Sequence, residues 1–198
     1  MDKIRVAVIG NGIIGEQHIK HHAANPDVEI AALCDIDEAR LNLMGDKYGV
    51  ARRFTHIGKL LAEGDIQAVD VCLHNNLHAP VSIAAMEAGK DVYCEKPMAG
   101  TFADALAMFN AMERTGRKLH IQLALIYEDA TKAAKRFIDA GRLGRLYHMR
   151  SYGFRRRGRP FVDGYATKEF VNSTTSGGGA PSDMAVYHPE GGMWYILQ

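Results

Sequence analysis

The sequence predicts an α/β protein built on a doubly wound parallel sheet and followed by a short α+β segment. Short apolar runs rich in β-branched residues alternate with helical stretches to about residue 122. A glycine-rich turn follows the first of these runs directly. Such alternation is typical of βαβ units, in which successive strands lie parallel and helices cover both faces of the sheet.

The composition is that of an ordinary globular chain. Its 198 residues carry a formal net charge of +1 and 47% of them are hydrophobic. The chain can therefore bury a sizeable core, and its charge does not favour nucleic acid or a membrane surface as a partner. The three cysteines lack framework spacing, which predicts reduced thiols in a cytoplasmic protein. We also expect no signal peptide and no membrane-spanning segment.

Six strands are expected from the apolar runs, with helices between them. The runs cover residues 3–9, 28–34, 52–54, 68–73, 91–94 and 118–123. Short connections and the right-handed crossover rule predict the strand order 3-2-1-4-5-6, with a ligand crevice over the carboxyl ends of the first and fourth strands. Asp37 is expected to cap the second helix, and Thr101 with Asp104 to open a helix that Gly116 ends.

The glycine-rich turn has the spacing of a dinucleotide-binding fingerprint. It follows a strand and precedes a helical pattern that starts near Glu16. In this motif the first glycine permits a tight turn, the second lets the backbone approach a pyrophosphate, and the third allows close packing of helix on strand. The residues expected to bind the cofactor here are Gly10, Asn11, Gly12, Ile13, Ile14 and Gly15.

Asp35 comes at the end of the second apolar run, about twenty residues beyond the fingerprint. Its carboxylate can accept hydrogen bonds from a ribose hydroxyl and would repel a 2′-phosphate, so the sequence favours NAD over NADP. Helix capping is the alternative role for Asp35, although Asp37 fits the cap position better.

Lys96 stands in the run Cys94-Glu95-Lys96-Pro97, just after the fifth predicted strand. A cation there can stabilise the oxyanion that develops as a hydroxyl loses its proton while the carbon that bears it transfers a hydride to nicotinamide. Pro97 restricts the backbone, and a cis peptide bond would aim the lysine into the crevice. A solvated loop lysine is the alternative, which the flanking glutamate and proline disfavour.

After the sixth strand the pattern changes. Residues 129–140 predict an amphipathic helix, 141–144 a turn, and 145–154 an antiparallel strand. We therefore divide the chain into a dinucleotide-binding domain, 1–123, and the start of an α+β domain, 124–198. A single strand leaves unpaired backbone groups, so we expect this second domain to be truncated or to complete its sheet with another copy of the chain.

Together these motifs resemble the Gfo/Idh/MocA oxidoreductase family, the relatives of glucose-fructose oxidoreductase and inositol dehydrogenase. The resemblance covers essentially the whole chain, and the Glu-Lys-Pro run is its most specific element. Further matching segments are residues 69–80, 88–97 and 138–144, and the glycines 177–179 followed by Asp183. The resemblance implies a Rossmann domain and hydride transfer between NAD(P) and a hydroxyl or carbonyl group of a sugar, polyol or related compound.

The resemblance also implies roles for residues of the crevice. Lys96 would contact the substrate hydroxyl, Glu95 would help to hold the nicotinamide ribose, and the segment around Asn75 would line the crevice. The cofactor-binding residues expected beyond the glycine turn are Asp35, His74, Asn75, Asn76, His78, Glu95, Lys96 and Pro97.

Two departures from the family pattern concern the site. His74 stands where the family commonly has proline, which frees a backbone amide and adds a titratable ring. The family usually has histidine four residues after Asp183, whereas this chain has Tyr187 there and His188 one residue later. Relatives of glucose-fructose oxidoreductase use tyrosine at this position. We therefore expect Lys96 and Tyr187 to form the proton-transfer pair, with His188 as the competitor. Asp183 would orient or hydrogen-bond the substrate.

Other clusters favour structural roles. His18, His21 and His22 lie on the first predicted helix without a carboxylate or cysteine at ligand spacing, so we expect a surface helix and no metal site. The basic run 155–159 fits a solvated turn better than a grip on an acidic sugar or an RNA backbone, because no aromatic platform accompanies it. The cysteines are expected to be packed thiols.

Three functions stay open at this point. The first is an NAD-dependent dehydrogenase that acts on a sugar or polyol, with a homo-oligomer formed through the second domain. The second is a glycoside hydrolase that uses bound NAD transiently, and the third is an NAD-binding regulator without catalysis. Net cofactor turnover separates the first two, and the fold alone decides among none of them.

Overall fold

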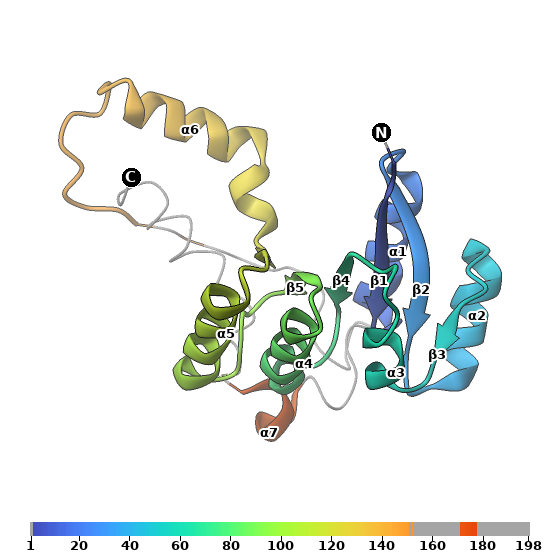
Figure 1. The fold of residues 1–198 in the computed structure, drawn as a ribbon. Helices are drawn as coiled ribbons and strands as arrows, with labels where there is room; N and C mark the ends of the chain where they lie inside the picture. The colour runs from blue at the N-terminus through green and yellow to red at the C-terminus, as the bar shows by residue number, and fades with distance from the viewer. Residues whose placement is uncertain (1, 151, 153–170, 178–198) are drawn as a thin grey trace.

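A computed structural model describes residues 2–150, 152 and 171–177 of the chain (Figure 1). The strands are β1 (Ile4–Ile9), β2 (Val28–Cys34), β3 (Arg53–Phe54), β4 (Ala68–Val71), β5 (Asp91–Glu95) and β6 (Leu119–Gln122). The helices are α1 (Ile13–Ala24), α2 (Glu38–Tyr48), α3 (Ile57–Leu61), α4 (Asn75–Glu87), α5 (Phe102–Thr115), α6 (Asp129–Asp139) and α7 (Ser173–Ser176), with a 3-10 helix η1 (Ala124–Tyr127) before α6.

The six strands form one parallel sheet in the order β3-β2-β1-β4-β5-β6. This confirms the doubly wound α/β architecture and the strand order expected from the sequence. After the edge strand β3 the chain returns to the middle of the sheet as β4, so the topological switch point lies between β1 and β4. The loops that follow β1, β4 and β5 therefore meet at one edge of the sheet.

Successive residues of the strands build two apolar cores. Ala7 and Ile9 of β1 belong to one core, which includes residues of α3, α4 and α5. Val8, between them, belongs to a second core with Ile19 of α1 and Leu41 of α2. Because neighbouring strand residues point to opposite faces, the helices cover both faces of the sheet.

The face that carries Val8 changes character across β4, β5 and β6. Asp70 pairs in register with Val8, Tyr93 with Asp70, and His120 with Tyr93. The ring of Tyr93 stacks on that of His120, with centroids 5.1 Å apart. Buried parallel strands are ordinarily apolar on both faces, so polar groups at these positions need partners from the covering elements.

Helix ends follow the expected chemistry. Asp37 caps α2 and Thr101 caps α5, each accepting a hydrogen bond from the amide three residues later, at 3.0 and 3.1 Å. Gly116 ends α5 in the left-handed conformation, with φ of 64°. The first helix begins at Ile13, earlier than the expected start at Glu16, because the glycine turn itself forms its first turn.

The second segment confirms the expected helix and turn but corrects the expected strand. α6 is formed, and Gly141 and Gly144 turn the chain with φ of 68° and 63°. Residues 145–150 form no strand, because a strand needs a ladder partner and the described residues supply none there. Several residues of the predictions lie outside the described part of the chain. They are residues 151, 153 and 154 of the expected strand, the basic run 155–159, Gly178, Gly179, Asp183, Tyr187 and His188. The division at residue 123 stays a prediction.

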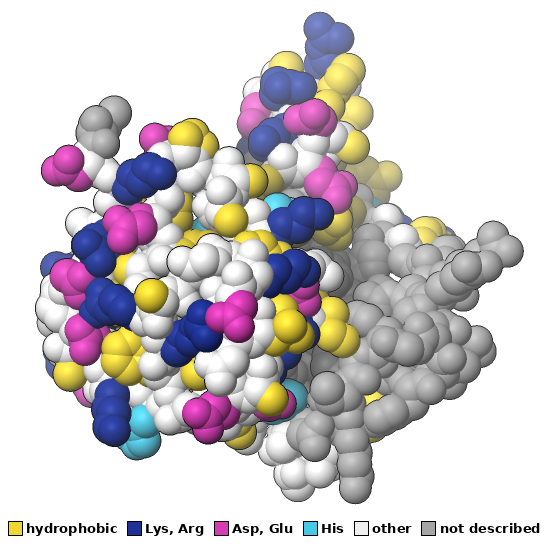
Figure 2. Space-filling model, turned by 90° about the vertical axis from the view of Figure 1, so that its right-hand side faces the viewer, with side chains coloured by type: hydrophobic (Ala, Val, Ile, Leu, Met, Phe, Trp, Pro, Cys, Tyr) yellow, Lys and Arg dark blue, Asp and Glu magenta, His cyan; other side chains and the backbone are white. Residues whose placement is uncertain are grey.

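Charges of both signs are interspersed over the face shown in Figure 2. Ion pairs join charged side chains at the surface of the protein, such as Arg53 with Asp46 at 2.6 Å. Exposed pairs of this kind each contribute little to stability. Among residues 2–150, 152 and 171–177, no helix is both long and apolar enough to cross a membrane.

Candidate active site

The three glycines of the turn after β1 each meet a different steric demand. Gly10 has a φ of +90°, and a Cβ there would collide with the carbonyl oxygen of Cys72 in the loop after β4. A Cβ on Gly15 would collide with the carbonyl oxygen of Gly10, so α1 packs directly on the turn. No described atom lies within 4 Å of the Cβ position of Gly12. The middle glycine therefore leaves room for a ligand against the backbone.

Two helices start at this edge without a side-chain cap. Gly12 precedes α1 and His74 precedes α4, and neither makes a capping hydrogen bond through a side chain. By contrast, Asp37 and Thr101 cap α2 and α5. The first amides and the positive dipole end of an uncapped helix bind anions. The open space at Gly12 and the start of α1 thus fit the diphosphate of a dinucleotide.

Asp35 follows β2 and holds the glycine turn. Its Oδ2 accepts a hydrogen bond from the Asn11 amide at 2.6 Å, and its Oδ1 accepts one from the Asp37 amide at 2.9 Å. Because Asp37 caps α2, Asp35 is not that cap. Its carboxylate stays beside the turn, where dinucleotide-binding folds place the group that contacts a ribose.

Arg40 covers the same turn from α2. Its Nε donates to the Asn11 carbonyl oxygen at 2.6 Å, and its guanidinium pairs with Glu16 at 2.6 Å. Hydrogen bonds from Lys47 and Arg40 lower the pKa of Glu16, which stays ionised. Glu16 therefore already pairs with the guanidinium of Arg40 beside the glycine turn.

β5 brings Glu95 and Lys96 to the carboxyl edge of the sheet. The Lys96–Pro97 peptide bond is cis, as expected for this run. The Lys96 amide donates to Oε2 of Glu95 at 3.0 Å. The glutamate carboxylate is thereby tied to the backbone that presents the lysine.

His78 joins the loops that follow β4 and β5. Its Nδ1 lies 2.7 Å from the Pro97 carbonyl oxygen and its Nε2 lies 3.0 Å from that of Leu73. Burial lowers the pKa of His78, and a neutral imidazole has a single N–H to donate to one of these oxygens. The ring is fully buried, so it is placed to hold the two loops together rather than to contact a bound ligand directly.

The other expected residues of α4 lie at its start. His74 and Asn76 are exposed. Asn75 Nδ2 donates to the Ser176 carbonyl oxygen at 2.6 Å, and Gly177 packs against the Cα of Gly100. Residues 171–177 therefore lie against the start of α4, at the same edge as Lys96, a contact that the sequence did not predict.

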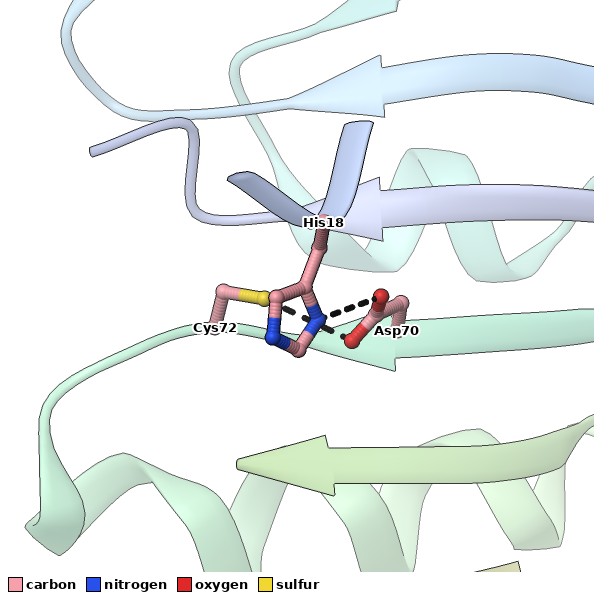
Figure 3. A group of neighbouring side chains, drawn as sticks. All are labelled: His18, Asp70 and Cys72. Carbon is pink, nitrogen blue, oxygen red and sulfur yellow. Dashed lines mark hydrogen bonds and ion pairs between the residues drawn. The ribbon is translucent and has the colours of Figure 1, made fainter. Parts of the chain in front are cut away.

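His18 is not a surface residue, contrary to the expectation for the first helix. It is 7% exposed, and its Nδ1 lies 2.8 Å from Oδ2 of Asp70, while its Nε2 lies 3.0 Å from Oε1 of Glu95. His22 Nε2 lies 2.7 Å from the same Asp70 oxygen. Figure 3 shows His18 and Cys72 converging on Asp70. α1 thus shares a buried polar network with β4 and β5.

The charges of this network reinforce one another. Burial alone would lower the pKa of His18, but its hydrogen bonds to Asp70 and Glu95 outweigh burial and raise the pKa to about 9. Burial would raise the pKa of Asp70, but hydrogen bonds from His18 and His22 outweigh it and lower the pKa. At neutral pH an imidazolium therefore lies between two carboxylates.

Three residues of the network are of metal-ligand type. Donor atoms of His18, Asp70 and Cys72 lie within 4.8 Å of one another and could hold a metal ion. Their hydrogen bonds already satisfy them, since Cys72 Sγ donates to Oδ1 of Asp70 at 3.4 Å and burial raises the pKa of its thiol. All three cysteines are free, as expected. Sequence spacing missed this group, although a carboxylate between Val69 and Val71 in a buried strand was a signal for it.

A comparison of the sequence with models of protein families identifies the family of this chain. A model of the Gfo/Idh/MocA group, described as an oxidoreductase family with an NAD-binding Rossmann fold, matches residues 4–123. The chain belongs to this family. It therefore carries an NAD-binding Rossmann domain, as the resemblance of its motifs implied.

Curated relatives of this Gfo/Idh/MocA chain include sugar and inositol dehydrogenases. Inositol 2-dehydrogenase of Salmonella typhimurium is 32% identical over 155 residues, which cover 75% of this chain and 46% of that protein. D-glucoside 3-dehydrogenase of Escherichia coli is 29% identical over 195 residues, covering 98% of this chain and 54% of that protein. The chain spans about half the length of the curated relatives it matches.

Solved structures share the fold of this family member. Myo-inositol 2-dehydrogenase from Lactobacillus plantarum superposes with a TM-score of 0.87 and 26% identity, covering 100% of this chain and 57% of that one. The structure of GenD2 from gentamicin A biosynthesis, in complex with NAD, gives a TM-score of 0.83 at 22% identity.

Proposed function

We propose that the protein is an NAD-dependent dehydrogenase that transfers a hydride between nicotinamide and the hydroxyl-bearing carbon of a sugar or polyol. The observation that carries this proposal is the position of Lys96, at the end of β5 on the edge where the glycine turn begins α1. The names of two relatives, inositol 2-dehydrogenase and D-glucoside 3-dehydrogenase, support the substrate class.

Each part of the crevice has a separate task in this proposal. The uncapped start of α1 and the backbone of Gly12 would bind the cofactor diphosphate, and Asp35 would accept hydrogen bonds from the adenosine ribose. Glu95 would hold the nicotinamide ribose. Bound NAD supplies the hydride acceptor, while the ammonium of Lys96 stabilises the negative charge that develops on the substrate oxygen.

The proton-transfer partner would come from the second segment. Tyr187 is the first choice for the residue that forms the proton-transfer pair with Lys96 at the substrate hydroxyl, and His188 is the alternative. Asp183 would orient the substrate. Support comes from the contact of Ser176 with Asn75, which holds the segment just before these residues at the crevice edge.

A titration of NADH fluorescence, followed by a sugar and polyol panel read by NADH absorbance, tests the function. We expect NADH binding and net NADH production with at least one polyol or sugar. NAD-dependent release of a sugar without net NADH would support a glycoside hydrolase instead. Binding without turnover of any compound would support a regulator. Sedimentation would test the proposed homo-oligomer, which a stable monomer would contradict.

The preference for NAD over NADP should depend on Asp35. Replacing Asp35 by alanine is expected to narrow the NAD preference by about 1–3 kcal/mol, because it removes a charged acceptor and the repulsion of a 2′-phosphate. The ratio of the two dissociation constants is the measurement. Asp37→Ala is the matched control, since it removes the α2 cap at a cost of about 1 kcal/mol in stability but leaves the ratio unchanged. A wild type that prefers NADP would refute the assignment.

The proton carrier should be separable by two variants. Tyr187→Phe removes only a hydroxyl, and His188→Ala removes only an imidazole. The variant that lacks the true carrier should lose about a hundredfold or more in kcat with little change in NADH affinity. Full activity in both variants would contradict the proposed pair.

A further inference from the structure

The buried network of His18, Asp70 and Glu95 lies beneath the proposed reaction site and contains charged groups, which a purely structural core seldom has. Asp70 is 0% exposed and accepts hydrogen bonds from two histidines and a thiol. His18 connects this carboxylate to Glu95, whose side chain is 16% exposed. Burying an ion pair is costly unless every group is paired, so such a network is a weak contribution to stability in itself.

Glu95 is held at both of its carboxylate oxygens. Oε1 faces Nε2 of His18 at 3.0 Å, and Oε2 accepts from the Lys96 amide at 3.0 Å. His18 is in turn held by Asp70 at its other ring nitrogen. These contacts form a continuous path of hydrogen bonds from Asp70 in the sheet, through the imidazole of His18 and the carboxylate of Glu95, to the backbone of Lys96.

We propose that His18 is a positioning residue of the reaction site, which fixes the Glu95 carboxylate and with it the Lys96 backbone so that they meet the nicotinamide ribose and the substrate. The inference rests on the proposed function. Removing the His18–Glu95 bond would leave a carboxylate free to turn away from the ribose and would loosen the loop that carries Lys96.

The alternative for the same path is a proton relay, and the charge of His18 argues against it. A relay group has to gain and lose a proton near the working pH. The groups that face His18 are Asp70, Glu95, His22, Cys72 and Tyr93. Two of them are carboxylates, and they keep the imidazole protonated with a pKa of about 9. A ring that stays protonated at neutral pH anchors Glu95 rather than carrying protons away.

Two substitutions separate the two ends of the imidazole. The amide nitrogen of asparagine matches Nδ1 of histidine, so His18→Asn keeps a donor to Asp70 and loses the one to Glu95. The amide nitrogen of glutamine matches Nε2, so His18→Gln keeps a donor to Glu95. His22→Gln is the control, because His22 touches Asp70 but not Glu95.

NADH and ADP are the probes, with binding of each measured by titration. ADP contains the diphosphate and adenosine ribose but lacks the nicotinamide ribose. We expect His18→Asn to weaken NADH binding about tenfold or more while ADP binding stays within about twofold, because only the Glu95 end is lost. His18→Gln and His22→Gln should bind NADH within about threefold of the wild type.

A variant that removes the charge of Glu95, the partner of His18, adds a second readout. Glu95→Gln should weaken NADH binding in the same way, and combining it with His18→Asn should weaken binding no further, because both act through one contact. Fully additive losses would overturn the inference. So would equal losses of NADH and ADP binding in His18→Asn, which would show that His18 serves the packing of α1. Unchanged NADH binding in His18→Asn would overturn the inference about His18 while leaving the proposed function intact. A wild type that binds ADP but not NADH would refute the proposed function, and this inference with it.

Discussion

Replacing Lys96 by alanine is expected to remove nearly all turnover. We expect kcat to fall by about a hundredfold to a thousandfold, the range observed when one donor to a developing oxyanion is removed. NADH affinity should stay within about tenfold of the wild type, because the proposed binding mode places the diphosphate and the adenosine ribose away from Lys96, at the glycine turn and Asp35. Steady-state kinetics with a substrate from the panel and a fluorescence titration with NADH measure the two effects.

The control for Lys96→Ala is Lys59→Ala. Lys59 is an exposed lysine in α3, so its loss removes the same charge without touching the carboxyl end of β5. This variant should keep full activity. If Lys96→Ala keeps the rate of the wild type, Lys96 does not act on the reacting hydroxyl and the proposed mechanism is wrong.

Alanine at Gly10 should lower the stability of the protein, whereas alanine at Gly12 should weaken cofactor binding. At Gly10 the φ of +90° and the carbonyl oxygen of Cys72 both oppose a Cβ. Strain and overpacking together should lower the free energy of unfolding by about 2–5 kcal/mol. Thermal denaturation should show this as a fall in Tm of about 2–4 °C per kcal/mol for a chain of this size.

Gly12→Ala should fold normally and lose the cofactor. Gly12 has a φ of −67°, which alanine adopts, and no described atom opposes its Cβ. The added methyl group would occupy the space proposed for the diphosphate, so NADH affinity should fall about a hundredfold with Tm nearly unchanged. A Gly12→Ala variant that binds NADH as tightly as the wild type would move the diphosphate away from this turn.

The sequence by itself determined most of the Rossmann domain. The apolar runs predicted all six strands and their order, and local capping chemistry predicted the roles of Asp37, Thr101 and Gly116. These features depend on side-chain periodicity and on hydrogen bonds between residues a few positions apart, which can be read along the chain. For the same reason the glycine turn and the end of β5 could be named as parts of one crevice.

The expected strand at 145–154 shows where this reasoning fails. Residues 145–150 have suitable composition but form no strand. A strand depends on the ladder that another segment offers, and residue preferences alone do not supply one. The pairing partner is a property of the tertiary structure.

The network of His18, Asp70 and Glu95 was likewise decided by the tertiary structure alone. Asp70 and Glu95 lie 52 and 77 positions from His18 in the sequence. They meet it only because α1, which packs on β1 and β2, directs this side chain toward β4 and β5. In the sequence His18 looked like one of three solvated histidines, since helical spacing does not say which turn faces a buried carboxylate. Long-range packing, rather than any local pattern, changes this histidine into a buried cation beside the proposed reaction site.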